Sequence, residues 1–589
     1  MKLSDYVIKW LEEKSVQRVF MLPGGGAMHL VDSLGSSKKI HCVPMLHEQS
    51  CAIAADAYAQ YTGNTGVVLV TTGPGATNVL TGMSASWIDG VPVIFIGGQV
   101  KREDMIGGKG IRQMGPQEVD MTELCKSITK YSVTVKEPTM IRYYLEKALY
   151  FATTGKPGPV WIEIPLDVQA TEIDDTGLDS YTGISFSNFI SAVDTKKISK
   201  LLEKAERPVI ILGNGARSID VDLADWLGYS KIPILTTWRA VDLIAEDYPY
   251  YFGRPGTVGQ RAANFIQQKA DLIISIGARL DLLQVGFSPE NFALNAKKII
   301  VDIDKRELTK YGKNFKIDYA INTTAEYFIR TFFNKKISNY IRPWIDTCNK
   351  LKKKYPNPDF SALNQECVGI NTYKFVDLLS NVLTKDDIIV PSSSGSAAEI
   401  TLQTFKVKYG QRIINSPGLG SMGFGLPAAI GACLAGGGNR RVISIIGDGD
   451  LQHNIQELSV IKRLELPIKI FILNNNGYAS IRNMQEARFN GRRVACDCNS
   501  GVLLPSICNV AKTYEIDYDI LNENSTENDI SKIINRKGSV ICELMIDPNL
   551  QTLPKVSSAV NNEGKLMSAP MEDLYPFRVR EEFNKVMEE

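Results

Sequence analysis

An acidic residue and a carboxamide stand at the ends of two apolar segments of the chain. Residues 442–446 are apolar and lead into Gly447-Asp448-Gly449, and residues 468–473 lead into a polar turn that contains Asn475 and Gly477. A helical pattern lies between the two segments, so the sequence predicts a βαβ unit. Because ligands collect at the carboxyl ends of the strands in an open parallel sheet, we expect both polar tips to face one ligand.

These tips offer only oxygen ligands, from Asp448, Asn475 and the carbonyl group of Gly477. Hard oxygens suit Mg²⁺, which usually also binds phosphate oxygens and water. The helix that begins after Gly449 points its N-terminus at the same place, which favours a phosphate there. The segment therefore predicts a Mg²⁺–diphosphate site. An ordinary crossover with polar turns is the alternative, but it does not explain oxygen ligands at both strand tips.

The bulk composition excludes several classes of protein. The 589 residues carry a formal net charge of +1, with 44% hydrophobic and 22% charged residues, so no basic excess points to nucleic acid. The ten cysteines are scattered, and reduced thiols in a cytoplasmic protein are favoured over a disulfide framework. The apolar runs are about five to seven residues long, too short to cross a membrane.

Strand-like runs alternate with helical patterns along the whole chain, which indicates α/β domains. A polar stretch after residue 170 and a basic stretch near residues 350–355 separate three blocks. We expect domains at 1–170, 188–335 and 366–548, followed by a tail at 549–589. Gly-rich turns follow apolar strands in the first and third blocks, so a distant internal duplication is possible.

Glu48 is the candidate acid of the first block. It follows an apolar segment and opens a helix rich in alanine, where burial would raise the pKa of its carboxyl group. Taken alone, it fits better as a helix N-terminal carboxylate. Two Gly-rich turns flank it in sequence, Pro23–Gly26 and Thr72–Asn78, and such turns bring backbone close to a ligand.

With PGGG, HEQ, TTGPGATN and GDG…NN in this order, the chain resembles the thiamine diphosphate (ThDP)-dependent decarboxylase superfamily, and within it the acetolactate (acetohydroxyacid) synthase branch. The resemblance covers almost the whole chain. It implies three doubly wound parallel-sheet domains: pyrimidine-binding, central FAD- or dinucleotide-binding, and diphosphate-binding. It also implies a homodimer or homotetramer, because the pyrimidine domain of one subunit faces the diphosphate domain of another; a regulatory subunit is left open.

The resemblance assigns roles to single residues. Glu48 would hydrogen-bond N1′ of the aminopyrimidine and so promote loss of the C2 proton, while Gln117 and Gly25 would lie near the reacting centre. Gln117 could equally be a solvated loop amide. Met422 would prop ThDP in its bent form, unless it simply packs in a core. Gly395 and Ser396 stand where the family binds diphosphate, although the usual Gln-His pair is replaced here by Ser396-Ala397. The expected cofactor-binding residues are Pro23, Gly24, Thr72, Gly73, Asn78, Gly395, Ser396, Met422, Gly447, Asp448, Gly449, Asn475, Gly477 and Tyr478.

Four segments of the central block favour a flavin: 213–217, 253–265, 275–281 and 301–308. Gly-rich loops after strands fit a dinucleotide's pyrophosphate, and an acidic residue after a later strand fits its ribose. Together they resemble the FAD-binding domain of acetolactate synthases, although related enzymes keep this domain without flavin. A bound FAD would be structural, because carboligation transfers no net electrons. The expected FAD-binding residues are Gly213, Gly215, Gly253, Gly256, Gly259, Arg279, Asp302 and Asp304.

Two departures from the family concern the acceptor. Leu282 and Leu283 replace an Asp-Arg pair whose Arg binds the acceptor carboxylate, and Met484 replaces a Trp. An apolar side chain cannot replace a bidentate guanidinium. We therefore expect decarboxylation of pyruvate and carboligation of the two-carbon hydroxyethyl/acetyl unit to a carbonyl acceptor that lacks a carboxylate at that position. The segments RQMGPQE, SIRNMQ and MSAPMEDLYPF resemble those of acetolactate synthase-like enzymes of surface-polysaccharide pathways, and this resemblance implies a keto-sugar nucleotide as the acceptor. The alternatives are an acetolactate synthase of branched-chain amino-acid biosynthesis and a flavin oxidoreductase of the pyruvate oxidase type.

Overall fold

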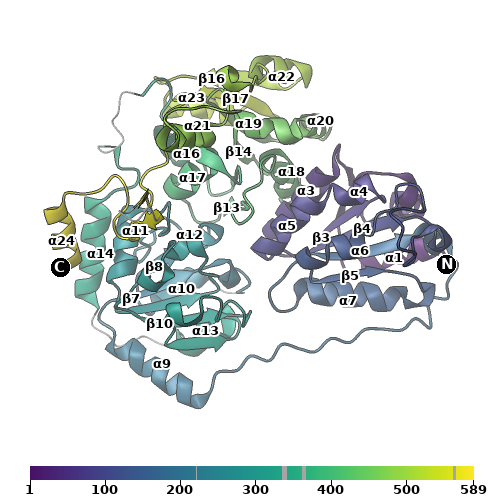
Figure 1. The fold of residues 1–589 in the computed structure, drawn as a ribbon, viewed down its shortest axis with the longest axis horizontal. Coiled ribbons are helices and arrows are strands. Elements are labelled where there is room, and N and C mark those ends of the chain that lie inside the picture. The colour runs from purple at the N-terminus through teal and green to yellow at the C-terminus, as the bar shows by residue number, and fades with distance from the viewer. Residues whose placement is uncertain (220–221, 334–340, 361–366, 561–565, 589) are drawn as a thin grey trace.

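Three parallel sheets, each with helices around it, form the molecule (Figure 1). The computed structural model describes residues 1–219, 222–333, 341–360, 367–560 and 566–588. The three α/β units confirm the predicted fold class. The predicted boundary residues 335 and 366 lie outside the described residues, so those domain limits stay predictions.

The N-terminal domain is built on a six-stranded sheet in the order β2-β1-β3-β4-β6-β5. Its first helix is the amphipathic segment at the start of the chain, and its third helix begins at Glu48. The strands are β1 (Arg18–Met21), β2 (His41–Pro44), β3 (Gly66–Val70), β4 (Val93–Gln99), β5 (Tyr131–Thr134) and β6 (Val160–Pro165). The helices are α1 (Leu3–Glu13), α2 (Met28–Ser36), α3 (Glu48–Thr62), α4 (Pro74–Thr77), α5 (Leu80–Asp89), α6 (Met121–Leu124), α7 (Ile141–Thr153) and α8 (Leu166–Ala170).

The central domain has a five-stranded sheet in the order β11-β10-β9-β7-β8. Its strands are β7 (Pro208–Leu212), β8 (Ile234–Thr236), β9 (Leu272–Ile276), β10 (Lys297–Asp302) and β11 (Tyr319–Asn322). Its helices are α9 (Ala192–Lys204), α10 (Leu223–Gly228), α11 (Arg261–Lys269), α12 (Leu282–Val285), α13 (Ala325–Phe332) and α14 (Arg342–Lys354).

The C-terminal domain repeats the topology of the N-terminal one. Its sheet has the order β13-β12-β14-β15-β17-β16, which is the same permutation of six consecutive strands. This identity supports the predicted internal duplication. The strands are β12 (Ile388–Pro391), β13 (Arg412–Ile413), β14 (Val442–Gly447), β15 (Ile468–Asn474), β16 (Asp517–Leu521) and β17 (Val540–Met545). The helices are α16 (Thr372–Val382), α17 (Gly395–Thr404), α18 (Gly425–Ala435), α19 (Asp448–Leu451), α20 (Leu458–Arg463), α21 (Ala479–Arg488), α22 (Ile507–Thr513) and α23 (Glu527–Ile534).

Each sheet is apolar on both faces because alternate residues of a strand enter different cores. In β3, Val68 and Val70 belong to one core, whereas Val67 and Leu69 belong to the core on the opposite face. The core that contains Val68 continues into the C-terminal domain, where Val442 and Ile470 belong to it. One apolar core therefore joins the first and third sheets.

Helices α3 and α18 cross inside this shared core (Figure 1). The crossing depends on small side chains: a methyl group on Gly431 would overlap the carbonyl oxygen of Ala54. A methyl group on Gly82 of α5 would overlap the methyl group of Ala52. Since α3 begins at Glu48, this packing fixes the helix that carries the candidate acid.

The C-terminal tail returns to the central domain and ends in α24 (Arg580–Glu588), with a short hairpin before it, β18 (Ser558–Val560) and β19 (Leu566–Ser568). Polar side chains of α11 bind its carbonyl groups: Arg261 donates to Leu574 and Pro576, and Asn264 donates to Met571. The ten cysteines are all free thiols. Over the described ranges, every helix is too short or too polar to cross a membrane.

Candidate active site

The structure brings the two predicted strand tips together. Strands β14 and β15 are adjacent and parallel, with Gly447 opposite Leu473, so Asp448 and Asn475 follow neighbouring strand ends. Asp448 is 2% exposed and lies at the start of α19. One carboxylate oxygen accepts a hydrogen bond from the N–H group of Gly449 at 2.9 Å, and the other accepts from Gly477 at 3.0 Å.

The chemistry of these atoms fits a hard cation. Burial raises the pKa of Asp448 to about 6, although surrounding N–H groups favour the ionised form, so the carboxylate would gain from a positive charge beside it. The side-chain oxygen of Asn475 is buried and has no hydrogen-bond partner in the structure. In the described segments no three His, Cys, Asp or Glu side chains gather as metal ligands, so a metal here needs amide and carbonyl oxygens as well. Such a donor set suits Mg²⁺.

Gly477 can only be glycine in this position. Its φ angle is 138°, and a side chain there would overlap the carbonyl oxygen of Cys496. The N–H group of the next residue, Tyr478, donates to that same oxygen at 2.8 Å. The ring of Tyr478 lies against Gly449, where a methyl group would overlap it. The turn after β15 is therefore held close to the turn after β14.

The other residues predicted to bind the diphosphate part of the cofactor also belong to the C-terminal domain. Gly395 has a φ angle of 68° and begins α17, with Ser396 next to it and the hydroxyl of Ser480 nearby. Met422 is 36% exposed, which argues against the alternative that it only fills a core. Its neighbour Gly423 is packed against Asn454.

Glu48 is the first residue of α3 and is 8% exposed. Its Oε2 accepts a hydrogen bond from the side-chain amide of Asn78 at 2.9 Å, so two predicted cofactor residues contact each other. Gly75 lies on the Oε1 side, where a methyl group would come within 3.4 Å of that oxygen. His47 caps the helix by accepting from Gln49. The helix-terminal position that the alternative required is thus also observed.

The first Gly-rich turn of the N-terminal domain contacts Thr71, the residue that directly precedes the second Gly-rich turn. Gly24 packs on Thr71, and the N–H group of Gly26 donates to the Thr71 hydroxyl at 3.0 Å. Pro23 and Gly25 are exposed, and Gly25 has open space where a side chain would stand.

Gln117 lies directly against the second Gly-rich turn. Gly73 has a φ angle of 63°, and a methyl group there would come within 2.8 Å of the Gln117 side chain. Gln117 itself has a φ angle of 61° and is exposed. Thr72 joins the same contact, since its hydroxyl lies 3.4 Å from the carbonyl oxygen of Gln117 and also donates to Gln99 at 2.8 Å. Gln117 is therefore a surface residue held by a specific backbone conformation.

Buried polar groups behind these turns escaped the sequence analysis. Glu118 accepts from the N–H groups of Ile106, Met114 and Gly115 and so closes the loop that carries Gln117. Glu163 on β6 is buried, and burial raises the pKa of its carboxyl group to about 7. Sequence adjacency to Gln117 was a usable signal for Glu118. Nothing local marks Glu163, which lies in an apolar strand.

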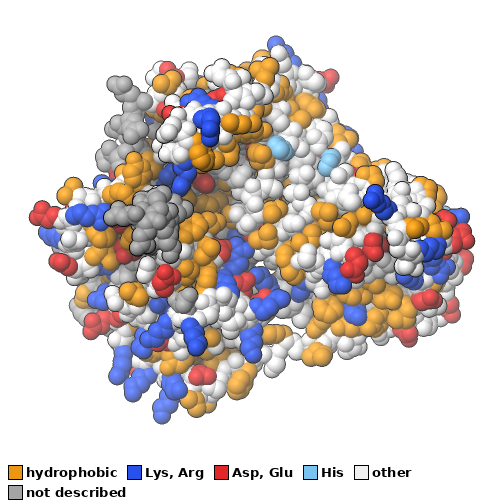
Figure 2. Space-filling model, in the orientation of Figure 1, with side chains coloured by type: hydrophobic (Ala, Val, Ile, Leu, Met, Phe, Trp, Pro, Cys, Tyr) orange, Lys and Arg blue, Asp and Glu red, His pale blue; other side chains and the backbone are white. Residues whose placement is uncertain are grey.

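A cavity of about 580 Å³ lies between the three domains. Figure 2 shows acidic and basic side chains gathered in the hollow between them. Four residues predicted for FAD line this cavity: Gly215, Gly256, Arg279 and Asp302. The other four lie outside its lining: Gly213, Gly253, Gly259 and Asp304. Gly213 instead allows the close approach of Ala278, and Asp304 pairs with Arg306.

Charged residues from different domains meet at the cavity wall. Arg217 and Arg412 both bind Asp242, at 2.5 and 3.0 Å. Burial alone would raise the pKa of Asp242, but the two guanidinium groups lower it to about 2. Arg239 of the central domain hydrogen-bonds Gln60 of the N-terminal domain and the carbonyl oxygen of Asn415 in the C-terminal domain.

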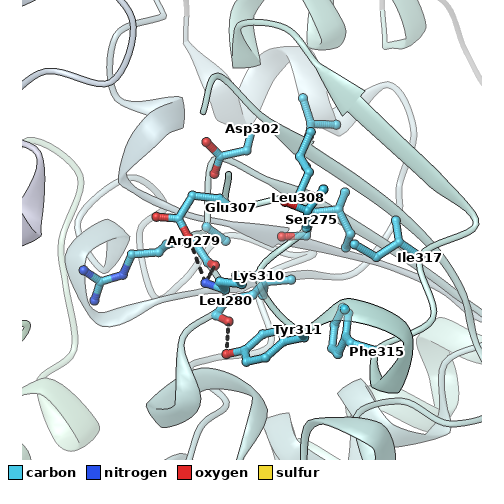
Figure 3. A pocket seen from close by; sticks show the side chains of 15 residues that line it. Ser275, Arg279, Leu280, Asp302, Glu307, Leu308, Lys310, Tyr311, Phe315 and Ile317 are labelled. Carbon is cyan, nitrogen blue, oxygen red and sulfur yellow. Dashed lines mark hydrogen bonds and ion pairs between the residues drawn. The ribbon is translucent and has the colours of Figure 1, made fainter. Parts of the chain in front are cut away.

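A strained turn at Arg279 and Leu280 directly precedes Leu282 and Leu283, two of the residues predicted to choose the acceptor (Figure 3). Arg279 and Leu280 have φ angles of 58° and 51°, which cost free energy in residues with a side chain. The ammonium group of Lys310 donates to the carbonyl oxygen of Arg279, and the hydroxyl of Tyr311 donates to that of Leu280 at 2.8 Å. These two bonds hold the turn from which α12 starts.

The three predicted acceptor residues lie on two domains. Leu282 and Leu283, in the first turn of α12, are 43% and 46% exposed, and Leu283 lines the large cavity. Met484 lies on α21 of the C-terminal domain and is partly exposed. All three are therefore open to solvent in the single chain.

Comparison with known families defines the class. The model described as "Thiamine pyrophosphate enzyme, N-terminal TPP binding domain" matches residues 1–124, the central-domain model of these enzymes matches 195–332, and the C-terminal TPP binding domain model matches 393–544. Thiamine pyrophosphate is another name for ThDP. The molecule is therefore a ThDP-dependent enzyme.

Individual relatives narrow the class. A probable acetolactate synthase large subunit of Methanocaldococcus jannaschii is 32% identical over 94% of this chain and 93% of its own length. The acetolactate synthase large subunit of Lactococcus lactis is 31% identical over 95% of both chains, and isozyme 1 of Escherichia coli is 29% identical over 95% and 96%. The chain belongs to the acetolactate synthase large-subunit family of ThDP enzymes, which carry out carboligation.

Proposed function

We propose that this enzyme decarboxylates pyruvate and joins the two-carbon unit to a second 2-oxo acid, which is the acetolactate synthase reaction. Relatives that are 29% to 32% identical over nearly the whole chain and are called acetolactate synthases carry this proposal. They favour it over the keto-sugar nucleotide acceptor predicted from the sequence, which finds no support among them.

Bound ThDP would supply the nucleophilic carbon and the electron sink that allow a 2-oxo acid to lose carbon dioxide. The residues of the chain would orient it and move protons. Glu48 has one oxygen occupied by Asn78, so Oε1 remains to share a proton with the aminopyrimidine ring. Gly75 leaves room beside that oxygen. Glu48 is thus bonded on one side and open on the other.

The C-terminal domain would hold the diphosphate and its cation. Asp448, the free oxygen of Asn475 and the carbonyl group of Gly477 would bind Mg²⁺, and the turn at Gly395–Ser396 would bind phosphate oxygens. Met422 would hold the cofactor in its bent form, since its side chain is exposed and free to contact a ligand. Gln117 and Gly25 would lie near the substrate.

FAD is the occupant that we propose for the cavity between the domains. Its volume, about 580 Å³, suits a large ligand, and a Gly-rich turn at Gly215 and an acidic residue at Asp302 stand in its wall. The visible absorption spectrum of the purified protein tests this, with acid-released cofactor identified by mass spectrometry. A colourless protein that binds no added FAD would contradict the proposal.

We also propose that the working enzyme is at least a homodimer and functions in the cytoplasm. Ten free thiols suit a reducing compartment. Light scattering of the purified protein would measure the mass of the assembly against the 65.2 kDa of one chain.

The decisive experiment supplies pyruvate as the only substrate, with ThDP and Mg²⁺, and identifies the products by mass spectrometry. Acetolactate is the expected product. One observation favours a second candidate: Leu282 and Leu283 offer no cation to an acceptor carboxylate. If pyruvate alone yields only slow release of carbon dioxide and a ketone or aldehyde acceptor without a carboxylate accelerates it, that second candidate replaces the first.

A further inference from the structure

A short 3-10 helix, η9 (Gln452–Glu457), follows the proposed metal ligand Asp448 by one turn of α19. Asn454 interrupts it, with backbone angles of −142° and 34° that are not helical. This kink turns the Asn454 side chain away from the helix path and into the interior, where it is 1% exposed. A buried carboxamide needs hydrogen-bond partners on both of its ends.

Both ends of Asn454 bind parts of the proposed site. Its oxygen accepts from the hydroxyl of Ser50 at 3.0 Å, and its nitrogen donates to the carbonyl oxygen of Gly423 at 2.7 Å. Ser50 lies two residues after Glu48, and Gly423 directly follows Met422. One side chain therefore links the acid of the N-terminal domain to the residue that we assign to the bent cofactor.

Glu457 makes a second link to the same segment. It is fully buried, and its carboxylate oxygens lie 3.2 and 3.4 Å from the N–H group of Leu46, two residues before Glu48. Farther along, Arg463 at the end of α20 donates to the carbonyl oxygen of Pro44 at 2.6 Å. The segment 44–50 is thus anchored to the C-terminal domain at three points, two before Glu48 and one after it.

The turn at Gly423 cannot move independently of η9. Gly423 has a φ angle of 81°, and a methyl group there would lie 2.6 Å from the Asn454 nitrogen and 2.8 Å from the Cβ atom of His453. Close-packed contacts transmit displacement because no void absorbs it. A shift of η9 would therefore displace both the Met422 turn and the start of α3.

We propose that Asn454 and Glu457 are positioning residues: they anchor segment 44–50 to the C-terminal domain of the same chain and so hold Glu48 in a fixed position for the cofactor that lies between two subunits of the proposed dimer. The inference rests on the proposed function for the role of Glu48. A buried carboxylate and a buried carboxamide cost free energy that apolar residues would not, so their presence needs a reason. Here the reason is geometry: catalytic contacts lose about 10²-fold in rate when a group is misplaced by roughly 1 Å.

The variants separate the two links. Asn454→Ala removes both hydrogen bonds of the carboxamide, and Ser50→Ala removes the bond to α3 together with the Ser50 contact to Glu457. Asn454→Asp keeps the acceptor for Ser50 but loses the donor to Gly423. Glu457→Ala removes the acceptor for Leu46, whereas Glu457→Gln keeps a neutral one. Ser33→Ala is the matched control, because Ser33 is also buried in the N-terminal domain and its hydroxyl bonds Ser4 and Asp5 away from the site.

The first readout is amide hydrogen exchange over residues 44–50 in the cofactor-free protein, which requires no activity. We expect roughly 10-fold faster exchange in Asn454→Ala and Glu457→Ala, close to wild-type exchange in Glu457→Gln, and no change in Ser33→Ala. The second readout is exchange of the C2 proton of bound ThDP, followed by NMR, which reports on Glu48 whatever the acceptor is. It should slow by about 10- to 100-fold in the two alanine variants, while ThDP affinity changes less than about 3-fold.

Two results would overturn the inference: unchanged exchange over residues 44–50 in both alanine variants, or faster exchange with an unchanged C2-proton rate. Ser50→Ala and Glu457→Gln keep the test decisive if an alanine variant fails to fold. Failure of pyruvate to give acetolactate would reject the proposed function but leave both readouts intact, so the two failures are distinguishable.

Discussion

At the scale of single residues, the two carboxylate oxygens of Glu48 have different surroundings. One oxygen of Glu48 is held by Asn78, while the other faces a glycine. A fixed orientation allows the carboxyl group to meet a cofactor ring without first reorganising. Replacement of either neighbour should therefore change the position of Glu48 more than its chemistry.

Glu48→Gln should retain ThDP and lose turnover by at least about 10²-fold, because an amide cannot exchange the proton that the carboxyl group shares. ThDP affinity and turnover measured on the same preparation check this. Glu123→Gln is the control, since Glu123 is an exposed carboxylate of the same domain. Near-normal turnover in Glu48→Gln would remove Glu48 from the mechanism.

Glu163 predicts a dependence of stability on pH. Its folded pKa of about 7 is above the unfolded value of about 4.3, so the folded state binds the extra proton between these values. Stability from this group is therefore present at low pH and falls as the pH rises towards 7. Glu163→Gln has no such proton, so its stability relative to wild type should rise by up to about 3 kcal/mol from pH 5 to 8.

Thermal unfolding midpoints of wild type and Glu163→Gln at several pH values would measure this difference. Glu137→Gln, an exposed carboxylate of the same domain, should follow the wild-type curve. Parallel curves for wild type and Glu163→Gln would mean that Glu163 is already ionised in the folded protein.

At the scale of elements, the packing of α3 against α18 determines the position of Glu48, the first residue of α3. Gly431→Ala would drive a methyl group into the carbonyl oxygen of Ala54 and separate the two helices. We expect a loss of about 1–3 kcal/mol of stability and a loss of turnover, because α3 carries Glu48 at its start. Denaturation midpoints and turnover rates would be measured together.

Gly35→Ala is the matched control for that substitution. Gly35 lies inside α2 with nothing within 4 Å of an added methyl group. Since alanine favours a helix over glycine, this variant should gain about 0.5–1 kcal/mol and keep full turnover. Equal effects of the two substitutions would show that the tight crossing is unimportant.

At the scale of the whole molecule, Arg239 joins all three domains. It bonds Gln60 and Asn415, and its charge lies near Asp56, whose pKa burial raises to about 6 while Arg239 opposes the rise. Arg239→Met should cost about 3–5 kcal/mol, because it leaves buried acidic groups without their cation. The cost should be larger at pH 8, where wild-type Asp56 is ionised, than at pH 5.

Calorimetry at the two pH values would test this, and separate transitions for the domains would mark the lost coupling. Arg330→Met provides the comparison, because Arg330 pairs with Glu326 on one exposed helix face and lies over the ring of Trp226, within a single domain. That surface pair should contribute less than about 1 kcal/mol at either pH. A small, pH-independent effect of Arg239→Met would contradict the proposed junction.

The local parts of the site were predictable because their signals are local. The apolar runs before Asp448 and Asn475 fix two neighbouring strands, and the polar tips then share one sheet edge. The sequence could not predict that the Met422 side chain is exposed or that Gly75 leaves space beside Glu48, because both depend on how the chain packs. Within the predicted FAD set, half of the residues line the cavity; of the other four, the three glycines serve the close packing of the domain and Asp304 pairs with Arg306.

By itself the sequence determined the class of fold, the family, and the residue types at the proposed metal, diphosphate and acid positions, because strand periodicity and turn chemistry act over a few residues. Only the tertiary structure decided how these positions meet. Ser50 and Asn454 are 404 residues apart, and no local pattern pairs them. The shared core of two sheets, the cavity between three domains and the anchoring of the Glu48 segment to the C-terminal domain all depend on such long-range contacts.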